Sequence, residues 1–311
     1  MSKILITGGA GYIGSILTPE LLKRGHEVSV IDNFLHREAS LLDCCKYASF
    51  SVFRGDARNK DLMAKLIQNA DFIIPLAGLV SASSCDKDPV AAVTTNLDAV
   101  KMILELRKPD QKIIFPNTNS GYGVGREGIY CDENTPLNPI SLYGKTKCEA
   151  EKAILESGNA VVFRLATVFG VSPKMRVDLL VNDFTYRAAN DQFLVLFEAH
   201  FKRNYIHVRD VAGAFVFGME NFDKMKNEAY NIGLDEANLS KKELCEEIKK
   251  QLPDFYFTEG EIGKDPDKRN YIVSNAKIAK AGFRPKISLQ EGISELIKCY
   301  QIVRKDRFSN N

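Results

Sequence analysis

Tyr143 carries a phenol and Lys147 an ammonium, and these two groups together could transfer a proton. They are four residues apart, so a helix over this segment would place both side chains on one face. A free tyrosine has a pKa near ~10, and lowering it by about 3 pH units, or about 4 kcal/mol, would make it a base near neutral pH. A lysine ammonium beside the phenol favours this change. The pair is common, and its lysine is usually only solvated, so its meaning depends on its surroundings.

A glycine-rich run lies close to the start of the chain. Residues 7–14 read Thr-Gly-Gly-Ala-Gly-Tyr-Ile-Gly and follow the apolar segment 4–6, which favours a strand, a turn and then a helix. Such glycines permit positive φ and let backbone N–H groups and the positive end of the helix approach a pyrophosphate. The alternative is a turn that only packs, but this context favours dinucleotide binding. The contributing positions are Gly8, Gly11, Tyr12, Ile13 and Gly14.

An aspartate follows at a distance that suits the same ligand. Asp32 closes the second apolar run about 20 residues beyond the turn, where a carboxylate can accept hydrogen bonds from an adenosine ribose. A 2′-phosphate there would meet like charge at a cost on the order of 4 kcal/mol, so NAD is favoured over NADP. Asp32 could instead only cap the following turn, and His36 and Arg37 nearby leave NADP open. The positive nicotinamide ring of bound NAD would add to the effect of Lys147 on Tyr143.

The sequence around these residues has the pattern of a parallel sheet, whose strands and helices would hold them in place. Short apolar and β-branched runs recur at residues 4–6, 28–31, 50–53, 72–74, 113–115 and 161–165, separated by stretches long enough for helices. Parallel strands need crossover connections and are buried on both faces, so they appear as continuous apolar blocks. We therefore predict an α/β fold with a Rossmann-type doubly wound parallel sheet.

The pattern becomes less regular after residue 165. We expect residues 1–165 to form the NAD-binding Rossmann domain, with 205–230 returning to it, and residues 166–204 and 231–311 to form a smaller α+β substrate-binding domain. An amphipathic helix is expected near the end of the chain, because apolar residues recur there at helical spacing: Leu289, Ile293, Leu296, Ile297, Tyr300 and Val303. Residues 304–311 are typical of a solvated tail.

Composition and charge argue against several other classes of protein. With 42 Lys and Arg against 40 Asp and Glu, the net charge of +2 provides no field that would attract nucleic acid or an anionic membrane. No apolar stretch approaches the ~18–20 residues of a membrane span. The seven cysteines are odd in number and none form a CxxC pair, which argues against a zinc or redox site and favours a reducing cytoplasm. We expect a soluble cytoplasmic protein with no metal and no nucleic-acid or membrane partner.

These features together resemble the extended short-chain dehydrogenase/reductase family, which includes the NAD-dependent sugar-nucleotide epimerases and dehydratases. The resemblance covers nearly the whole chain. Its motifs are the glycine turn, Asp32-Asn33, Gly55-Asp56, Leu76-Ala77-Gly78, Tyr122-Gly123, Tyr143 with Lys147, and residues 204–210. It implies an enzyme that acts on a nucleotide-activated sugar with NAD as cofactor.

The resemblance also implies roles for individual residues. Tyr143 would be the base for a sugar hydroxyl, Lys147 would hold the nicotinamide ribose, and Thr118 would hydrogen-bond the reacting oxygen. Further positions that it places along the cofactor are Asn33, Asp56, Ala57, Leu76, Ala77, Gly78, Asn96 and Ala166. Positions that it places against the substrate, besides Thr118, are Asn119, Ser120, Asn182, Arg203 and Arg269. Among these, Arg203 matches the arginine that clamps the nucleotide pyrophosphate.

The chain departs from the family pattern at two places, one of which bears on the reaction and the other on the substrate contacts. Members that eliminate water across C5 and C6 carry Asp-Glu directly after the threonine, whereas this chain has Asn119 and Ser120, which cannot exchange protons near pH 7. A 4,6-dehydratase is therefore not expected. Thr167 stands where many relatives have asparagine, which puts the usual sugar and base contacts in question.

Three stretches look closest to a narrower group, the GDP-heptose 4-dehydrogenases of bacterial capsule polysaccharide biosynthesis: residues 116–123, 164–189 and 265–271. We therefore predict NAD-dependent oxidation at C4 of a nucleotide-activated sugar, with a GDP-heptose as the candidate. A nucleotide-sugar 4-epimerase is the alternative, because the same groups can return the hydride to the opposite face of the ketone. A non-catalytic NAD-sensing Rossmann protein is a further alternative.

The resemblance also implies an oligomer. Family members usually pair through two helices per subunit, and residues 90–107 and 143–156 are the candidate segments in this chain. We expect a homodimer, with a tetramer also open.

Overall fold

The structure of the protein is a computed structural model that describes residues 1–36, 39–260 and 269–303. Arg37, residues 265–268 of the stretch compared with the heptose dehydrogenases, and the tail at 304–311 lie outside the described residues. Over the described ranges, no helix combines the length and the apolar character that crossing a bilayer requires.

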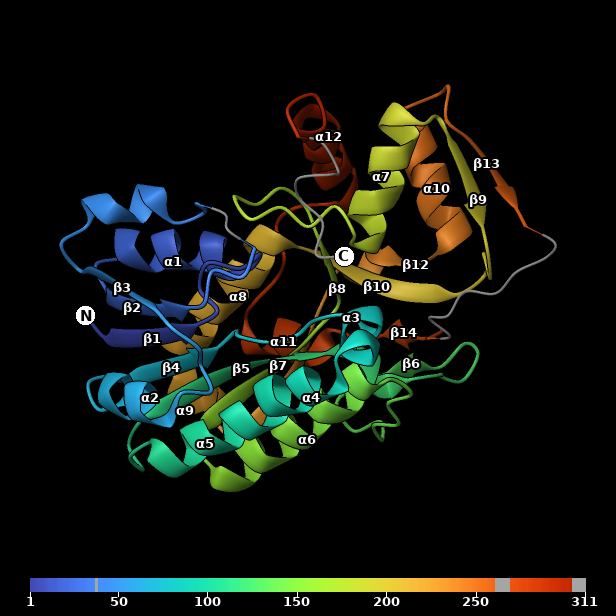
Figure 1. The fold of residues 1–311 in the computed structure, drawn as a ribbon. Helices are drawn as coiled ribbons and strands as arrows, with labels where there is room; N and C mark the ends of the chain where they lie inside the picture. Colours follow the sequence, from blue (N-terminus) through green and yellow to red (C-terminus); the bar gives the residue numbers. More distant parts are fainter. Residues whose placement is uncertain (37–38, 261–268, 304–311) are drawn as a thin grey trace.

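A seven-stranded sheet forms the larger part of the molecule (Figure 1). Its strands are β1 (Lys3–Thr7), β2 (Glu27–Asp32), β3 (Phe50–Arg54), β4 (Phe72–Pro75), β5 (Lys112–Thr118), β7 (Ala160–Leu165) and β11 (Glu228–Ile232). All of them run parallel, in the order β11-β7-β5-β4-β1-β2-β3. The apolar runs of the sequence coincide with β1 to β5 and β7, and the expected doubly wound parallel sheet is confirmed.

Alternate residues of these strands pack against separate layers of helices. Ile4 and Ile6 lie in one apolar core, which contains residues of α1 (Gly14–Lys23), α8 (Val208–Glu220), α9 (Phe222–Met225) and α11 (Ala276–Ala281). Leu5 and Phe115 lie in another, which contains residues of α2 (Lys60–Ile67), α5 (Ala99–Leu106) and α6 (Leu142–Ser157). Because both faces are covered, both sets of alternating side chains are apolar, which explains the continuous blocks in the sequence.

A smaller group of elements has an apolar core of its own, drawn from residues 169–300. Its strands are β8 (Thr167–Phe169), β10 (Lys202–His207) and β12 (Asn238–Ser240) in one sheet, and β9 (Phe193–Leu196) with β13 (Tyr256–Glu259) in another. Its helices are α7 (Leu180–Asn190), α10 (Lys241–Lys249) and α12 (Leu289–Cys299). These elements lie on one side of the large sheet (Figure 1), while β11 returns to that sheet beside β7. The division into domains at the residue numbers given above stays a prediction.

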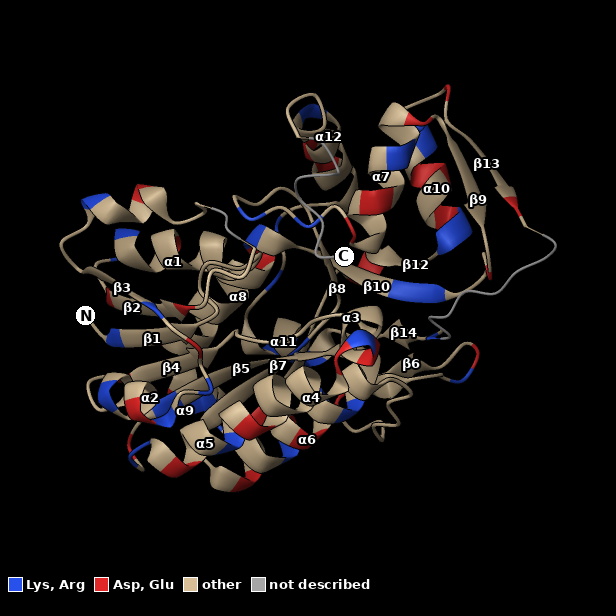
Figure 2. Cartoon of the chain, viewed as in Figure 1, with Lys and Arg blue, Asp and Glu red and all other residues tan. Residues whose placement is uncertain are grey.

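Several short elements complete the structure. They are η1 (Leu42–Lys46), α3 (Ala82–Lys87), α4 (Pro89–Val93), the π-helical turn η2 (Thr94–Asp98), η3 (Asn119–Tyr122), η4 (Asp235–Ala237), and the strand pair β6 (Tyr130–Cys131) with β14 (Ile272–Val273). The segments proposed for a dimer interface include α4, η2, α5 and α6, and acidic and basic side chains are mixed along α5 and α6 (Figure 2). The dimer stays a prediction.

The closing helix is shorter than its apolar spacing suggests. α12 begins after Ser288, whose side chain forms a reciprocal capping box with Glu291. It ends at Cys299, so Tyr300 and Val303 lie beyond the last helical residue. Tyr300 continues the pattern because its ring is buried in the same core and its hydroxyl donates to the carbonyl of Asn182 at 2.8 Å. The expected amphipathic closing helix is present, and its apolar spacing continues one turn past the last helical residue.

Candidate active site

The predicted site residues gather at the carboxyl ends of the central strands. Thr7, Asp32 and Thr118 end β1, β2 and β5, and residues 76–78 follow β4 directly. In open α/β sheets, the crevice outside this edge is where ligands bind. The smaller part of the molecule reaches the same edge, since the hydroxyl of Tyr12 donates to the carbonyl of Gly170 at 2.6 Å.

The glycine turn has the close backbone packing that its sequence predicts. Gly8 has a φ of 70°, and a Cβ there would lie 2.6 Å from the backbone of Ala77. A Cβ on Gly14 would lie 2.5 Å from the carbonyl of Gly9. Within the described residues, the backbone N–H groups of Tyr12 and Ile13 have no hydrogen-bond acceptor. The turn therefore offers unpaired N–H donors at the start of α1, as a pyrophosphate requires.

The carboxylate of Asp32 is bonded to the backbone on both sides of the site. Its Oδ2 accepts the N–H of Ala10 at 2.9 Å, and its Oδ1 accepts the N–H of Phe34 at 2.8 Å. The turn-capping contact considered as an alternative is thus present. Each carboxylate oxygen keeps acceptor capacity for a ribose hydroxyl, so capping and ribose binding are compatible.

Asn96 lies next to the predicted cofactor crevice, but its side-chain amide is hydrogen-bonded within the protein. The side chain is buried, accepts the N–H of Leu79 at 2.8 Å and donates to the carbonyl of Leu79 at 2.9 Å. The N–H of Ala77 donates to Thr7 Oγ1 at 3.2 Å, and a Cβ on Gly78 would come within 3.0 Å of Asn96 Oδ1. These contacts hold the backbone after β4, including Leu76, in place, so Asn96 is best described as a positioning residue.

The residues predicted for the adenine end lie on exposed loops next to Asp32. The N–H of Gly55 donates to the carbonyl of Asp32 at 3.0 Å, which brings residues 55–57 alongside Asn33. Arg58 binds the carboxylate of Asp56 with its Nε at 2.9 Å and its Nη2 at 2.6 Å, and this hydrogen bonding lowers the pKa of Asp56. Ala57 is buried, unlike its exposed neighbour Arg58.

Tyr143 and Lys147 lie one turn apart at the start of α6. The side chain of Ser141 caps this helix by accepting the N–H of Gly144 at 3.1 Å. Burial raises the pKa of Tyr143 to about 12, and the nearby charges of Arg269 and Arg176 and a hydrogen bond with Thr118 oppose that rise. The described residues alone therefore leave the phenol protonated near neutral pH, and the cationic ring of bound NAD has to contribute to its activation.

Lys147 is a buried cation without a hydrogen-bond acceptor among the described residues. Its side chain is 7% exposed, and its Nζ lies 3.9 Å from the centroid of the Phe115 ring. Burial lowers the pKa of Lys147 to about 7. A buried ammonium in this state gains free energy from a ligand oxygen, and a ribose hydroxyl would provide one.

Thr118, Ser120 and Arg269 meet beside Tyr143. Thr118 Oγ1 lies 2.9 Å from Ser120 Oγ and accepts the N–H of Ser120 at 3.1 Å. Arg269 donates from Nη1 to Ser120 Oγ. Asn119 is sealed from solvent, and its amide has no partner among the described residues. The structure therefore brings together Thr118, Ser120, Arg269 and Tyr143, and leaves Asn119 behind them in the interior.

The remaining predicted residues connect the two parts of the molecule. Asn182 is fully buried, accepts the N–H of Gly170 at 3.0 Å and donates to the carbonyl of Arg176 at 2.8 Å, so its amide is used within the protein. Arg203 is buried on β10, donates to the carbonyl of Lys202 at 2.8 Å and lies 5.6 Å from the ring of Tyr271. Ala166 is buried between β7 and β8, with its N–H bonded to Ile232. The predicted substrate contact of Asn182 is thus the one that the geometry supports least.

Sequence reasoning missed a buried ionic network beneath the active site. Arg164 donates from Nη2 to Glu151 at 2.6 Å and from Nη1 to the hydroxyl of Tyr122 at 3.1 Å. Asn117 donates to the other oxygen of Glu151. Two signals could have found it: Arg164 is a charge inside an apolar strand, and Glu151 follows Lys147 by four residues on the buried face of α6.

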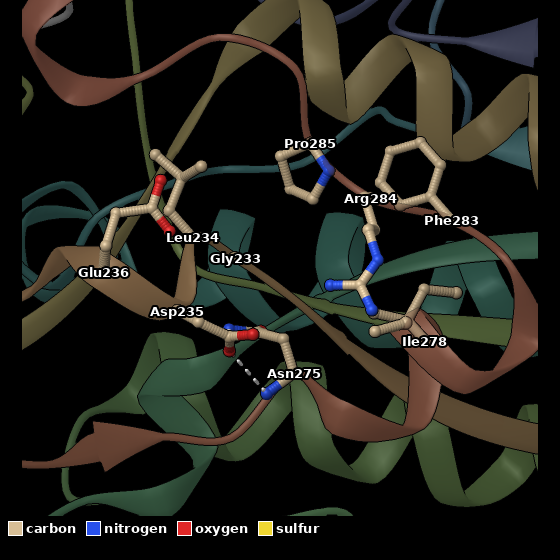
Figure 3. A pocket seen from close by; sticks show the side chains of 10 residues that line it. Gly233, Leu234, Asp235, Glu236, Asn275, Ile278, Phe283, Arg284 and Pro285 are labelled. Atoms are coloured by element: carbon tan, nitrogen blue, oxygen red, sulfur yellow. Dashed lines mark hydrogen bonds between the residues drawn. The ribbon is translucent and has the colours of Figure 1, made fainter.

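A separate pocket of about 130 Å³ lies behind the turn that follows β11 (Figure 3). Its lining includes Asp235, Glu236, Asn275 and Arg284, and Asp235 Oδ1 accepts a hydrogen bond from Asn275 at 3.0 Å. None of the predicted site residues line it, so it is distinct from the crevice described above. Across the ranges that the structure describes, no group of three or more His, Cys, Asp or Glu side chains could hold a metal ion.

Known proteins match this chain over most of its length. Residues 4–233 match the model of the NAD dependent epimerase/dehydratase family. A putative UDP-glucose 4-epimerase of Methanocaldococcus jannaschii is 28% identical over 310 residues, covering 94% of this chain and 97% of that protein. A UDP-N-acetyl-alpha-D-glucosaminuronate decarboxylase of Bacillus cytotoxicus is 25% identical over 332 residues, covering 98% of this chain and 99% of that protein.

Solved structures agree with this match. The crystal structure of the UDP-glucose 4-epimerase of Thermus thermophilus in complex with NAD superposes with a TM-score of 0.81 at 25% identity, covering 97% of this chain and all of that one. The unpaired N–H groups of the glycine turn, the carboxylate of Asp32 and the unbonded ammonium of Lys147 fit the same cofactor. The chain belongs to the NAD dependent epimerase/dehydratase family and is an NAD-dependent enzyme of nucleotide-sugar modification.

Proposed function

We propose that the enzyme oxidises C4 of a nucleotide-activated sugar, with Tyr143 as the base. The observation that carries the proposal is the pairing on α6: Lys147 is a buried cation without an acceptor among the described residues, one turn after a tyrosine that shares a hydrogen bond with Thr118. A structural lysine would instead be solvated or paired.

Each residue of the site has its own role in the proposed oxidation. Thr118 holds the 4-hydroxyl of the sugar beside Tyr143, and Tyr143 in its deprotonated form takes the proton from that oxygen. Lys147 holds the nicotinamide ribose and places a positive charge that favours the tyrosinate. When bound, NAD accepts the hydride that leaves C4. Asp32 and the N–H groups of Tyr12 and Ile13 hold the adenosine ribose and the pyrophosphate.

Elimination across C5 and C6 is not part of the proposal. Such a reaction needs an acid and a base next to Thr118, and those positions hold Asn119, which is sealed in the interior, and Ser120, which accepts a hydrogen bond from Arg269. We propose that the 4-keto sugar is released, as in the GDP-heptose 4-dehydrogenases of capsule biosynthesis that residues 116–123 and 164–189 resemble.

A 4-epimerase is the second candidate, favoured by the relatives. The M. jannaschii and T. thermophilus proteins are both described as UDP-glucose 4-epimerases, one of them as putative. The same Tyr143 and Thr118 would serve that reaction if the ketone turned over in the site before the hydride returned.

One substitution tests the assignment of the base. Tyr143→Phe removes the phenolic oxygen and should abolish turnover while leaving NAD affinity within about threefold, measured by calorimetry. Undiminished turnover in this variant would refute the assignment. Screening GDP-, UDP-, CDP- and dTDP-sugars by mass spectrometry of the bound ligand identifies the substrate for the assay.

Deuterium placed at C4 of the substrate distinguishes a dehydrogenase from an epimerase. Deuterium that accumulates on released NADH indicates a dehydrogenase, whereas deuterium retained in a sugar with inverted C4 indicates an epimerase. A protein that binds NAD but no nucleotide sugar in the same screen would point to the sensor alternative.

A further inference from the structure

A segment from the smaller part of the molecule is bonded directly to the glycine turn. Residues 170–176 follow β8, and the hydroxyl of Ser172 donates to the carbonyl of Tyr12 at 2.8 Å. Ser172 Oγ also lies 2.9 Å from Ser15 Oγ, and Tyr12 donates its phenolic hydrogen to Gly170 at 2.6 Å. The start of α1 and this segment are therefore held together by three buried contacts.

Arg176 ends this segment and has a fixed backbone. Its carbonyl accepts a hydrogen bond from Asn182 Nδ2 at 2.8 Å, and the same nitrogen lies 3.3 Å from the hydroxyl of Tyr12. One amide group therefore links Arg176 to the glycine turn. The residue as a whole is 6% exposed.

The guanidinium of Arg176 is held along one edge only. Its Nε donates to Asp178 Oδ1 at 2.9 Å, and its Nη2 donates to Oδ2 of the same carboxylate. Its Nη1 has no acceptor among the described residues. Asp178 thus orients the planar guanidinium and leaves the two N–H donors of Nη1 for a ligand. Diphosphate oxygens can accept hydrogen bonds from donors arranged in this way.

The charge of Arg176 reaches three groups that surround the cofactor crevice. It lowers the pKa of Tyr12 on the glycine turn, of Tyr143 on α6, and of His36 in the loop after Asp32. Lys174, which is buried in the same segment, also lowers the pKa of His36. Together with the hydrogen bonds that join residues 170–176 to the glycine turn, this puts the guanidinium near the turn, the start of α6 and the loop after Asp32.

We propose that Arg176 is a cofactor-binding residue that donates from Nη1 to the pyrophosphate of bound NAD, so that the smaller part of the molecule closes over the glycine turn. The turn itself contributes only backbone N–H groups and no basic side chain. Arg176 supplies the positive charge that the turn lacks, and Asp178 is the positioning residue that orients its guanidinium. The proposal rests on NAD as cofactor and is independent of the chemistry at C4.

Calorimetry with two ligands tests the contact. NAD contains the pyrophosphate, whereas adenosine forms one end of NAD and carries no phosphate. The test variant is Arg176→Gln combined with Asp178→Asn, which removes both charges of this ion pair. We expect its Kd for NAD to rise about 10- to 100-fold, as for the loss of a hydrogen bond to a charged group. Its Kd for adenosine should stay within about twofold.

Two controls make the result specific. Asp178→Asn alone keeps the donors of Arg176 and should lose less NAD affinity than the double variant. Arg187→Gln removes another arginine paired with an aspartate, on α7 at 2.9 Å from Asp183, and should leave both affinities unchanged. Thermal unfolding without ligand verifies that all variants are folded.

Other outcomes would overturn the proposal. Equal losses of NAD and adenosine affinity would indicate that Arg176 only supports the fold. Unchanged NAD affinity together with weaker binding of UDP or GDP to the NAD complex would assign the contact to the diphosphate of the substrate. Neither readout uses turnover, so a failure here is distinguishable from a failure of the proposed reaction.

Discussion

Lys147 and Arg164 are two buried cations that lie on either side of Glu151, and they differ in what they contact. Each is 7% exposed. Arg164 binds Glu151 through Nε and Nη2 and also donates to the hydroxyl of Tyr122 and the carbonyl of Glu133. Lys147 faces the ring of Phe115 and has no acceptor in the described part of the chain.

Their protonation follows from this difference. Hydrogen bonding and the charge of Glu151 raise the pKa of Arg164 despite its burial, whereas burial lowers the pKa of Lys147 to about 7. Removing one member of a buried ion pair destabilises the folded chain, whereas a buried cation without partners is available to a ligand. The comparison assigns Arg164 to the scaffold and Lys147 to the site, and four experiments test this assignment.

The largest expected effect is on stability. Arg164→Met leaves Glu151 as an uncompensated buried carboxylate, and we expect the free energy of unfolding to fall by about 3–5 kcal/mol. Urea unfolding measures it. Adding Glu151→Gln to the same variant should recover a large part of the loss, because no charge is then left unpaired. A loss below about 1 kcal/mol in Arg164→Met would remove the contrast between the two cations.

The next effect is on turnover. Lys147→Met should lower kcat by about 10²- to 10³-fold, as expected for the loss of one electrostatic group at a reacting centre. The free energy of unfolding near pH 7 should not decrease as it does in Arg164→Met, since Lys147 has no partner to lose among the described residues. Steady-state kinetics and urea unfolding of the same preparation check both parts. A stability loss matching that of Arg164→Met would assign Lys147 to the scaffold.

A smaller effect is expected at the hydroxyl beside the base. Thr118→Val removes the oxygen that bonds Tyr143 and Ser120, and kcat should fall about 10- to 100-fold, the equivalent of one hydrogen bond to a charged group. Thr185→Val is the matched control, because its hydroxyl bonds only the carbonyl of Val181 within α7. If the two variants lose equal activity, Thr118 has no particular role in the reaction.

The last effect is a pH dependence of stability, which is small for each pH unit. In the NAD-free protein, the pKa of Lys147 is about 7, below the usual 10.5. Between these values the unfolded chain binds a proton that the folded chain does not, so Lys147 should make the free energy of unfolding rise with pH across that window, by at most about 1.4 kcal/mol per pH unit. The difference between wild type and Lys147→Met isolates this contribution from other groups. A difference that is flat from about pH 7 to 10 would contradict the lowered pKa.

Much of the fold was predictable because its signals are local. The apolar runs of β1 to β5 and β7 were visible because both faces of a parallel sheet are covered, and β11 was less visible because residues 228–232 include Tyr230 and Asn231. The glycine turn was visible because Gly8 and Gly14 have no room for a Cβ. Tyr143 and Lys147 were visible because helical spacing alone places them on one face.

The sequence was sufficient to predict six strands of the large sheet, the glycine turn and the pair on α6. The folded structure was needed to show that the amide of Asn182 is bonded within the protein, that Glu151 pairs with Arg164, and that Ser172 is bonded to a turn 160 residues earlier. The physical reason is that backbone conformation and apolar periodicity depend on neighbours in the chain, whereas the state of a charge depends on burial and on partners that only the folded chain brings together.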